Sequence, residues 1–202
     1  MGKRVREEID TDHLLTVAAR FFAEHGFDGI GIREIAAEAG IPATSIYRHF
    51  DSKLGLFQEA SAKRYEQTFA IVSAAVEGGK TPEQKLNALV DTFFDIFIED
   101  QVLFMLLQRD VTESVLRKTR SVMKGHYDQY IQLIEGILHG FGGDKASQTD
   151  VMTLAALIFG YCELIFITRQ GELQIEDAWY REQKDHLRHQ VALICRRMTG
   201  LS

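Results

Sequence analysis

Residues 43–49 combine hydroxyl, phenol, guanidinium and imidazole side chains within seven consecutive positions. An arginine in such a stretch can donate two hydrogen bonds to guanine O6 and N7, which discriminates between bases by about 1–3 kcal/mol. Hydroxyl and phenol groups can hold phosphates and fix the register on DNA. An ordinary surface helix also carries polar residues, so the stretch by itself leaves both interpretations open. The candidate DNA contacts are Arg33, Ala43, Thr44, Ser45, Tyr47, Arg48, His49 and Lys53.

The apolar residues around this stretch predict two short helices joined by a tight turn. Gly40 has the backbone freedom to end the first helix, and Pro42 suits the first position of the second. Two helices joined by a short turn that contains glycine form the helix-turn-helix pattern. In the second helix, Ile46 and Phe50 point inward, while Thr44, Ser45 and Arg48 point the opposite way. The first helix has apolar residues at i, i+3, i+4 and i+7, namely Ile32, Ile35, Ala36 and Ala39.

Two further helices are expected to flank this pair. The earlier one starts at Asp10 or Thr11 and ends at Gly26, after which Phe27 folds back onto the small core. The later one covers residues 53–77, capped by Asp51 or Ser52. Lys53 lies in its first turn, where a positive charge opposes the helix dipole and a DNA phosphate would offset it. Residues 1–9 are either a solvated tail or a basic arm that touches DNA, with Lys3, Arg4 and Arg6.

Residues 11–57 resemble the DNA-binding domain of the TetR family of bacterial transcription regulators. The resemblance implies an all-α fold, with a helix-turn-helix domain at residues 1–52 and a helical regulatory domain at 53–202. Two positions depart from the family pattern. Gly31 stands where Thr or Ser usually caps a helix, and Ala43-Thr44 stands where Lys-Gly is common. The matching strings are residues 18–27 (AARFFAEHGF), 32–36 (IREIA), 39–41 (AGI), 45–50 (SIYRHF) and 52–53 (SK).

The remaining sequence predicts five more helices, about nine in all, and no strand. Thr81 and Gln84 form a capping box around Pro82, which starts a helix that runs to about Glu99. Four further helices are expected near residues 102–109, 113–138, 149–169 and 176–199. In the TetR family an effector pocket lies between the middle helices, although core packing explains any single residue there equally well. The candidate pocket residues are Phe93, Phe97, Phe104, Met105, Gln108, Arg109, Tyr127, Tyr130, Phe159 and Glu163.

The last two expected helices suggest a homodimer. Residues 149–169 are apolar nearly all round, so this helix needs cover on both sides, one from its own domain and one from a partner. Residues 176–199 carry an apolar seam, and two such helices fit a four-helix dimer interface. A large monomeric core is the alternative. The candidate interface residues are Ile158, Cys162, Ile165, Leu187, Val191, Ile194 and Met198.

Composition bounds the remaining possibilities. The 202 residues are 46% hydrophobic and 26% charged, as in soluble globular proteins. A net charge of -6 counts against a purely electrostatic DNA binder but not against a specific one. Cys162 and Cys195 suggest no disulfide framework and no secretory signal is present, so we expect a cytoplasmic protein. No phosphate loop, nucleophile elbow or metal-ligand spacing appears, and His186 and His189 fit solvated or interface residues.

Together these features predict a homodimeric, ligand-responsive transcription regulator, most simply a repressor, with no enzymatic activity, cofactor, metal or membrane. Each subunit would place residues 43–49 in a major groove of double-stranded operator DNA. Half-sites of the palindrome would lie about 34 Å apart or a multiple of that. The effector would be a small apolar or amphipathic molecule. The alternatives are a regulator controlled by a protein partner and a helical binding protein that does not contact DNA.

Overall fold

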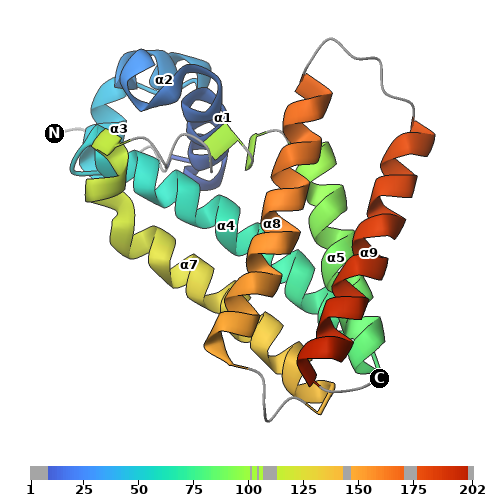
Figure 1. Cartoon of the computed structure of the whole chain (residues 1–202). Coiled ribbons are helices and arrows are strands. Elements are labelled where there is room, and N and C mark those ends of the chain that lie inside the picture. Colours follow the sequence, from blue (N-terminus) through green and yellow to red (C-terminus); the bar gives the residue numbers. More distant parts are fainter. Residues whose placement is uncertain are drawn as a thin grey trace, which may run out of the picture. The chain divides into compact units, whose positions relative to one another are not determined.

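The structure is a computed structural model that describes residues 9–100, 102–103, 105–106, 113–142, 147–170 and 177–199. Every regular element within these residues is an α-helix, which confirms the all-α prediction (Figure 1). Of the short helix expected at 102–109, residues 102–103 and 105–106 are described, and all four are helical. The eight helices with defined bounds are α1 (Thr11–Gly29), α2 (Ile32–Glu38), α3 (Ala43–His49), α4 (Lys53–Glu77), α5 (Pro82–Glu99), α7 (Glu113–Gly140), α8 (Gln148–Gln170) and α9 (Asp177–Thr199).

The helices form two compact units. Unit 1 extends to Tyr65 and also takes in Val102–Met123, whereas unit 2 comprises Glu66–Gln101 and Lys124–Ser202. Helix α4 therefore contributes its first half to unit 1 and its second half to unit 2. The functional domains at 1–52 and 53–202 remain a prediction.

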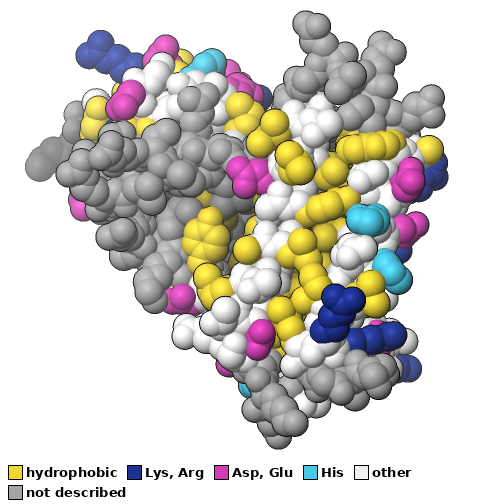
Figure 2. All heavy atoms as spheres, in the orientation of Figure 1, with side chains coloured by type: hydrophobic (Ala, Val, Ile, Leu, Met, Phe, Trp, Pro, Cys, Tyr) yellow, Lys and Arg dark blue, Asp and Glu magenta, His cyan; other side chains and the backbone are white. Residues whose placement is uncertain are grey.

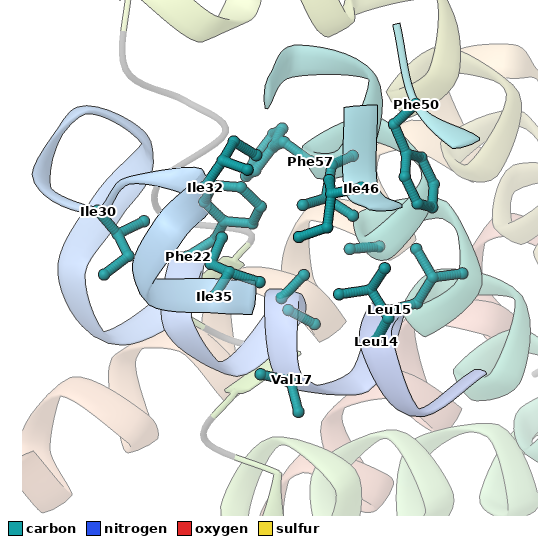
Figure 3. Close-up of a cluster of buried hydrophobic side chains, with 14 of the residues drawn as sticks. Leu14, Leu15, Val17, Phe22, Ile30, Ile32, Ile35, Ile46, Phe50 and Phe57 are labelled. Atoms are coloured by element: carbon teal, nitrogen blue, oxygen red, sulfur yellow. The ribbon is translucent and has the colours of Figure 1, made fainter. Parts of the chain in front are cut away.

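Unit 1 is built on one apolar core, shown in Figure 3. Phe22 stacks on Phe27 at 6.0 Å between ring centroids, and both meet Phe57 of α4 edge-on at 5.0 and 5.5 Å. Phe27 thus folds back onto the core as predicted. These contacts join α1 to α4. The short helices α2 and α3 pack against the same apolar core through their buried residues. The buried members of the core are Leu14, Leu15, Val17, Ala18, Ala19, Phe22, Ala23, Ile30, Ile32, Ile35, Ala36, Ile46, Phe50, Leu56, Phe57, Ala60 and Leu106.

Helix α1 begins where the sequence predicts and continues past its predicted end. The Asp10 carboxylate accepts a hydrogen bond from the His13 backbone N–H at 3.0 Å, which caps the first turn. Gly26 has φ 77° and breaks the helical geometry, but a further helical turn follows it as far as Gly29. The glycine therefore produces a kink rather than an end, because the apolar residues after it still pack on the core.

Unit 2 is organised around α5, α8 and α9, which pack against one another (Figure 1). The predicted capping box starts α5: Thr81 Oγ1 accepts from the Gln84 N–H at 3.2 Å, and Gln84 Oε1 accepts from the Thr81 N–H at 3.3 Å. Polar contacts at the helix surfaces fix α9 in place. The Arg188 guanidinium donates to Asp91 of α5, and the Tyr161 hydroxyl of α8 hydrogen-bonds Gln183 Oε1 at 2.7 Å.

Helix α8 is the one described helix with a stretch, Gln148–Ile165, that is long and apolar enough to cross a membrane. Its six-residue stripe of Val151, Leu154, Ala155, Ile158, Cys162 and Ile165 is buried within the subunit. Because this stripe packs with α5 and α9 in a helical core, its apolar character is explained without a membrane.

Candidate nucleic-acid interface

The turn between α2 and α3 has the geometry that the sequence predicts. Gly40 adopts φ 68°, a left-handed conformation that follows the end of α2, and the Ile41 N–H donates to the Ala36 carbonyl at 3.0 Å. Pro42 differs by one position from the prediction. It lies at the cap of α3 rather than in its first turn, with φ -63° and ψ 137°. The bounds of α3 match the predicted 43–49.

One face of α3 is anchored in the core of unit 1 and the other is open. Ile46 and Phe50 are buried, and Figure 3 shows both side chains within the cluster that includes Leu14 and Leu15. Thr44, Arg48 and His49 are exposed, Ala43 is half-buried, and Tyr47 is 60% exposed. An apolar anchor on one face with polar groups on the other is the arrangement that a recognition helix requires.

Ser45 is the one residue of α3 whose predicted direction is wrong. Its side chain is only 1% exposed, so it does not face outward as expected. The Arg48 guanidinium lies one turn along the helix and donates through Nη2 to Ser45 Oγ at 2.8 Å. Helical periodicity predicts the direction in which a side chain leaves the helix, but it does not account for burial by neighbouring side chains. The short Ser45 side chain is easily covered by the long Arg48 side chain.

The cationic side chains of unit 1 differ in whether a carboxylate forms an ion pair with them. Arg20 pairs with Glu38, and Lys63 Nζ lies 2.7 Å from Asp12 Oδ1. Among the described residues, Arg33, Arg48 and Lys53 form no such ion pair. Arg33 is exposed on α2, Arg48 bonds Ser45, and Lys53 lies over the Phe27 ring at 4.8 Å. The three cations predicted to contact DNA thus keep their charge available for phosphate or base contacts.

The N-terminus of α2 compensates for the missing Thr or Ser. Gly31 has no side chain to cap the helix, and Glu34 instead accepts from the Gly31 N–H through Oε2 at 2.7 Å. A β-carbon at position 31 would lie 3.1 Å from this carboxylate oxygen. The first turn of α2 therefore already holds a negative charge, which makes it a poor place for a phosphate.

Part of the predicted effector pocket comes together in unit 2. Phe93 meets Phe159 at 4.6 Å, Tyr130 at 5.5 Å and Phe97 at 4.8 Å between ring centroids. Tyr130 also meets Phe69 of α4 at 5.1 Å, a contact that the sequence did not indicate. Burial raises the pKa of the Tyr130 hydroxyl well above its ordinary value, so this group remains a neutral donor.

Other residues predicted for the pocket lie elsewhere. Tyr127, which was expected to line the pocket, is 44% exposed. Met105 packs against the core of unit 1 instead of the aromatic cluster, because its segment belongs to that unit. Glu163 is half-buried on α8. Phe104, Gln108 and Arg109 lie outside the described residues, as does the basic arm of Lys3, Arg4 and Arg6.

The predicted dimer residues are largely on the inner side of their helices. Ile158, Cys162 and Ile165 of α8, with Leu187 and Val191 of α9, are buried within the subunit itself. Side chains that are already covered by their own subunit offer little surface to a partner, so their part in a dimer interface remains a prediction. Ile194 and Met198 are half-buried near the end of α9.

A different stripe of α8 is open. Met152, Leu164 and Ile167 are 52%, 60% and 54% exposed, and the small residues Ala156 and Gly160 between them are exposed too. Figure 2 shows apolar side chains along α8 and α9 on this face of the molecule. The signal for this stripe was present in the sequence, because a helix that is apolar all round must have a second apolar face. Periodicity could not show which face turns inward.

The described residues contain no group of three His, Cys, Asp or Glu side chains arranged to hold a metal ion. Cys162 and Cys195 are buried and form no disulfide, and loss of solvation raises the pKa of each thiol to about 12. A thiol with so high a pKa is a poor nucleophile near neutral pH. The exposed hydrogen-bonding groups of α3 remain the strongest candidate for function.

Comparison with known proteins agrees with this site. Residues 14–60 match the family described as "Bacterial regulatory proteins, tetR family". The HTH-type transcriptional repressor KstR2 of Rhodococcus jostii (strain RHA1) is 26% identical over 83% of this chain and 78% of its own length. Among solved structures, SCO4454, a TetR-family regulator from Streptomyces coelicolor, superimposes with a TM-score of 0.71 at 19% identity, covering 93% and 95% of the two chains.

A second solved structure also resembles this chain over nearly its whole length. FadR from Bacillus subtilis in complex with stearoyl-CoA has a TM-score of 0.64 at 19% identity, covering 95% of this chain and 98% of its own. At these identities the structural likeness shows the fold alone, whereas the family match covers the helix-turn-helix itself. Residues 14–60 are thus a DNA-binding domain of the TetR family of bacterial transcription regulators, and the relatives that match most of the chain are transcription regulators rather than enzymes.

Proposed function

We propose that this protein is a ligand-responsive repressor that binds an inverted-repeat operator as a homodimer. The observation that carries the DNA-reading part is the difference among the cations of unit 1. Arg33, Arg48 and Lys53 are free of carboxylates in the described structure, whereas Arg20 and Lys63 are neutralised. Arg48 supplies the base-reading group, and Tyr47, Thr44 and Lys53 supply contacts to phosphate.

The open stripe of α8 supports the homodimer. Met152, Leu164 and Ile167 together expose an apolar face, and a second copy of the same helix would cover it symmetrically. Ala156 and Gly160 in the middle of the stripe let two helix backbones approach closely. Ile194 and Met198 of α9 would lie at the margin of this interface. Two recognition helices per dimer then require two half-sites in the operator.

The aromatic cluster of unit 2 supports a small effector with a long apolar part. Phe93, Tyr130 and Phe159 offer ring faces and edges to such a group, and the Tyr130 hydroxyl can donate to a polar atom. The similar FadR structure contains stearoyl-CoA, so an acyl-CoA thioester is the first effector class to test. Binding would favour a conformer in which the two recognition helices no longer match the operator, and DNA would weaken effector binding equally. Such a protein acts in the cytoplasm, where its operator is.

Selection of binding sites from random double-stranded DNA tests the DNA-reading part. The wild-type protein should enrich an inverted repeat, and Arg48→Ala should lose the preference at one base pair of each half-site. Arg20→Ala is the matched control, because Arg20 is also an exposed arginine of unit 1, but its charge is already neutralised by Glu38. The selection should be repeated after the protein is refolded from denaturant, which removes any bound effector. If the wild-type protein enriches no repeat in either form, the proposal is refuted.

The effector part has its own test. Long-chain acyl-CoA should raise the melting temperature by mass action and release the operator, whereas coenzyme A alone should do neither. A regulator controlled by a protein partner is the rival function. It would bind the operator and remain insensitive to acyl-CoA, free fatty acids and a wider set of apolar compounds.

A further inference from the structure

The contact between Ser45 and Arg48 gives a specific role to a serine that the sequence assigned to DNA. Ser45 Oγ is buried and accepts a hydrogen bond from Arg48 Nη2 at 2.8 Å, while the rest of the Arg48 side chain is exposed. A buried hydroxyl is poorly placed to reach a phosphate. It is well placed to hold the guanidinium beside α3.

We infer that Ser45 is a positioning residue for base reading, which orients Arg48 toward guanine without contacting DNA itself. This inference rests on the proposed reading of DNA by α3. A guanidinium has five N–H donors, and the contact with Ser45 uses one of them. The second N–H of Nη2 and those of Nη1 remain available as the fork that fits guanine O6 and N7.

The physical advantage is preorganisation. A free arginine side chain samples many rotamers and loses that freedom when it docks against a base. The hydrogen bond to Ser45 restricts the side chain before DNA arrives, and the charged donor makes that bond stronger than one between neutral groups. A binding step that costs less entropy strengthens only the contact that Arg48 makes. Ser45 should therefore affect specificity and leave sequence-independent binding unchanged.

The test compares Ser45→Ala, Arg48→Ala and the double variant on the selected operator and on a scrambled duplex over a range of salt concentrations. Ser45→Ala should weaken operator binding about 3- to 10-fold, the size expected for one hydrogen bond, and relax the same base pair as Arg48→Ala. Scrambled DNA should be bound as before, with an unchanged salt slope. Added to Arg48→Ala, the Ser45 substitution should have no further effect.

Two controls separate positioning from direct contact and from folding. Thr44→Ala removes the neighbouring exposed hydroxyl, and it should weaken both duplexes alike if that group holds a phosphate. Ser45→Thr keeps the hydroxyl and should restore specificity. Thermal unfolding of each variant checks that unit 1 is intact. Nuclear magnetic relaxation of the Arg48 Nε–H group in the free protein should report greater mobility in Ser45→Ala.

Three results would overturn the inference: equal weakening of both duplexes by Ser45→Ala, the same loss in the Arg48→Ala background, or an unchanged base preference together with unchanged Arg48 mobility. A wild-type protein that selects no inverted repeat would instead refute the proposed function and this inference with it. A repeat that wild type selects, and that Ser45→Ala selects with the same base preference and the same Arg48 mobility, refutes the positioning role alone.

Discussion

The ammonium group of Lys53 lies over the aromatic face of Phe27, 4.8 Å from the ring centroid. This cation–π contact joins the first residue of α4 to the core of unit 1, where Phe27 packs on Phe22 and Phe57. Ser52 Oγ accepts from the Gly55 N–H at 3.1 Å and caps the same turn. The positive charge that the helix dipole disfavours is thus held in a defined place at the start of α4.

Lys53→Ala should weaken binding to operator and scrambled DNA by the same factor. A lysine that neutralises one phosphate contributes about one unit to the salt slope, so the slope should fall by about one. Fluorescence anisotropy titrations at several salt concentrations measure both quantities. Lys63→Ala is the control, because Asp12 already pairs with Lys63. A change confined to the operator would contradict a phosphate role for Lys53.

Leu164→Glu should dissociate the dimer. A carboxylate placed in an apolar interface without a partner costs several kcal/mol, so the dimer dissociation constant should rise by at least about 100-fold. Sedimentation analysis over a range of protein concentrations measures it. Ile71→Glu provides a matched control, since Ile71 of α4 is 56% exposed but lies outside the open stripe of α8. If Leu164→Glu stays dimeric, another surface forms the dimer.

Tyr130→Phe should separate effector binding from core packing. The described residues give the Tyr130 hydroxyl no hydrogen bond, so its removal should change the free energy of unfolding by less than about 1 kcal/mol. Affinity for acyl-CoA should fall if the hydroxyl donates to a polar atom of the effector. Phe93→Ala is the contrasting variant, with an expected loss of about 3–5 kcal/mol in stability. Calorimetry measures both affinity and unfolding, and an unchanged affinity in Tyr130→Phe would remove this residue from the site.

The two buried thiols should make stability fall in alkaline solution. Cys162 and Cys195 have pKa values near 12 in the folded chain, against an ordinary value of 9.0. As pH rises from about 9 to about 12 the unfolded chain loses these protons and the folded chain keeps them, so unfolding becomes more favourable. Denaturant titrations across this range should show the decline, and replacing both cysteines with alanine should reduce it. A thiol reagent should label the native protein slowly at pH 8 and rapidly once it unfolds.

Local chemistry explains why several elements could be predicted from the sequence. Helices α3, α4 and α5 have the predicted bounds because their starts depend on neighbours in the chain. Pro42 precedes α3, Ser52 caps α4, and Thr81 with Gln84 caps α5. The buried residues of α5 follow from its sequence as well, since its apolar residues recur on one face of the helix: Leu86, Leu89, Val90, Phe93, Phe94 and Phe97.

Tertiary packing decided the features that have no local cause. Helix α8 has apolar residues on both faces, so only its contacts with α5 and α9 determine that Ile158 and Cys162 turn inward and Leu164 stays open. Met105 was expected beside the aromatic cluster, but its segment packs on the core of unit 1. The sequence by itself therefore determined the helix-turn-helix and the type of residue on its surface. The fold decided which apolar face remains exposed and that Ser45 lies beneath Arg48, because burial depends on neighbours that are distant or flexible.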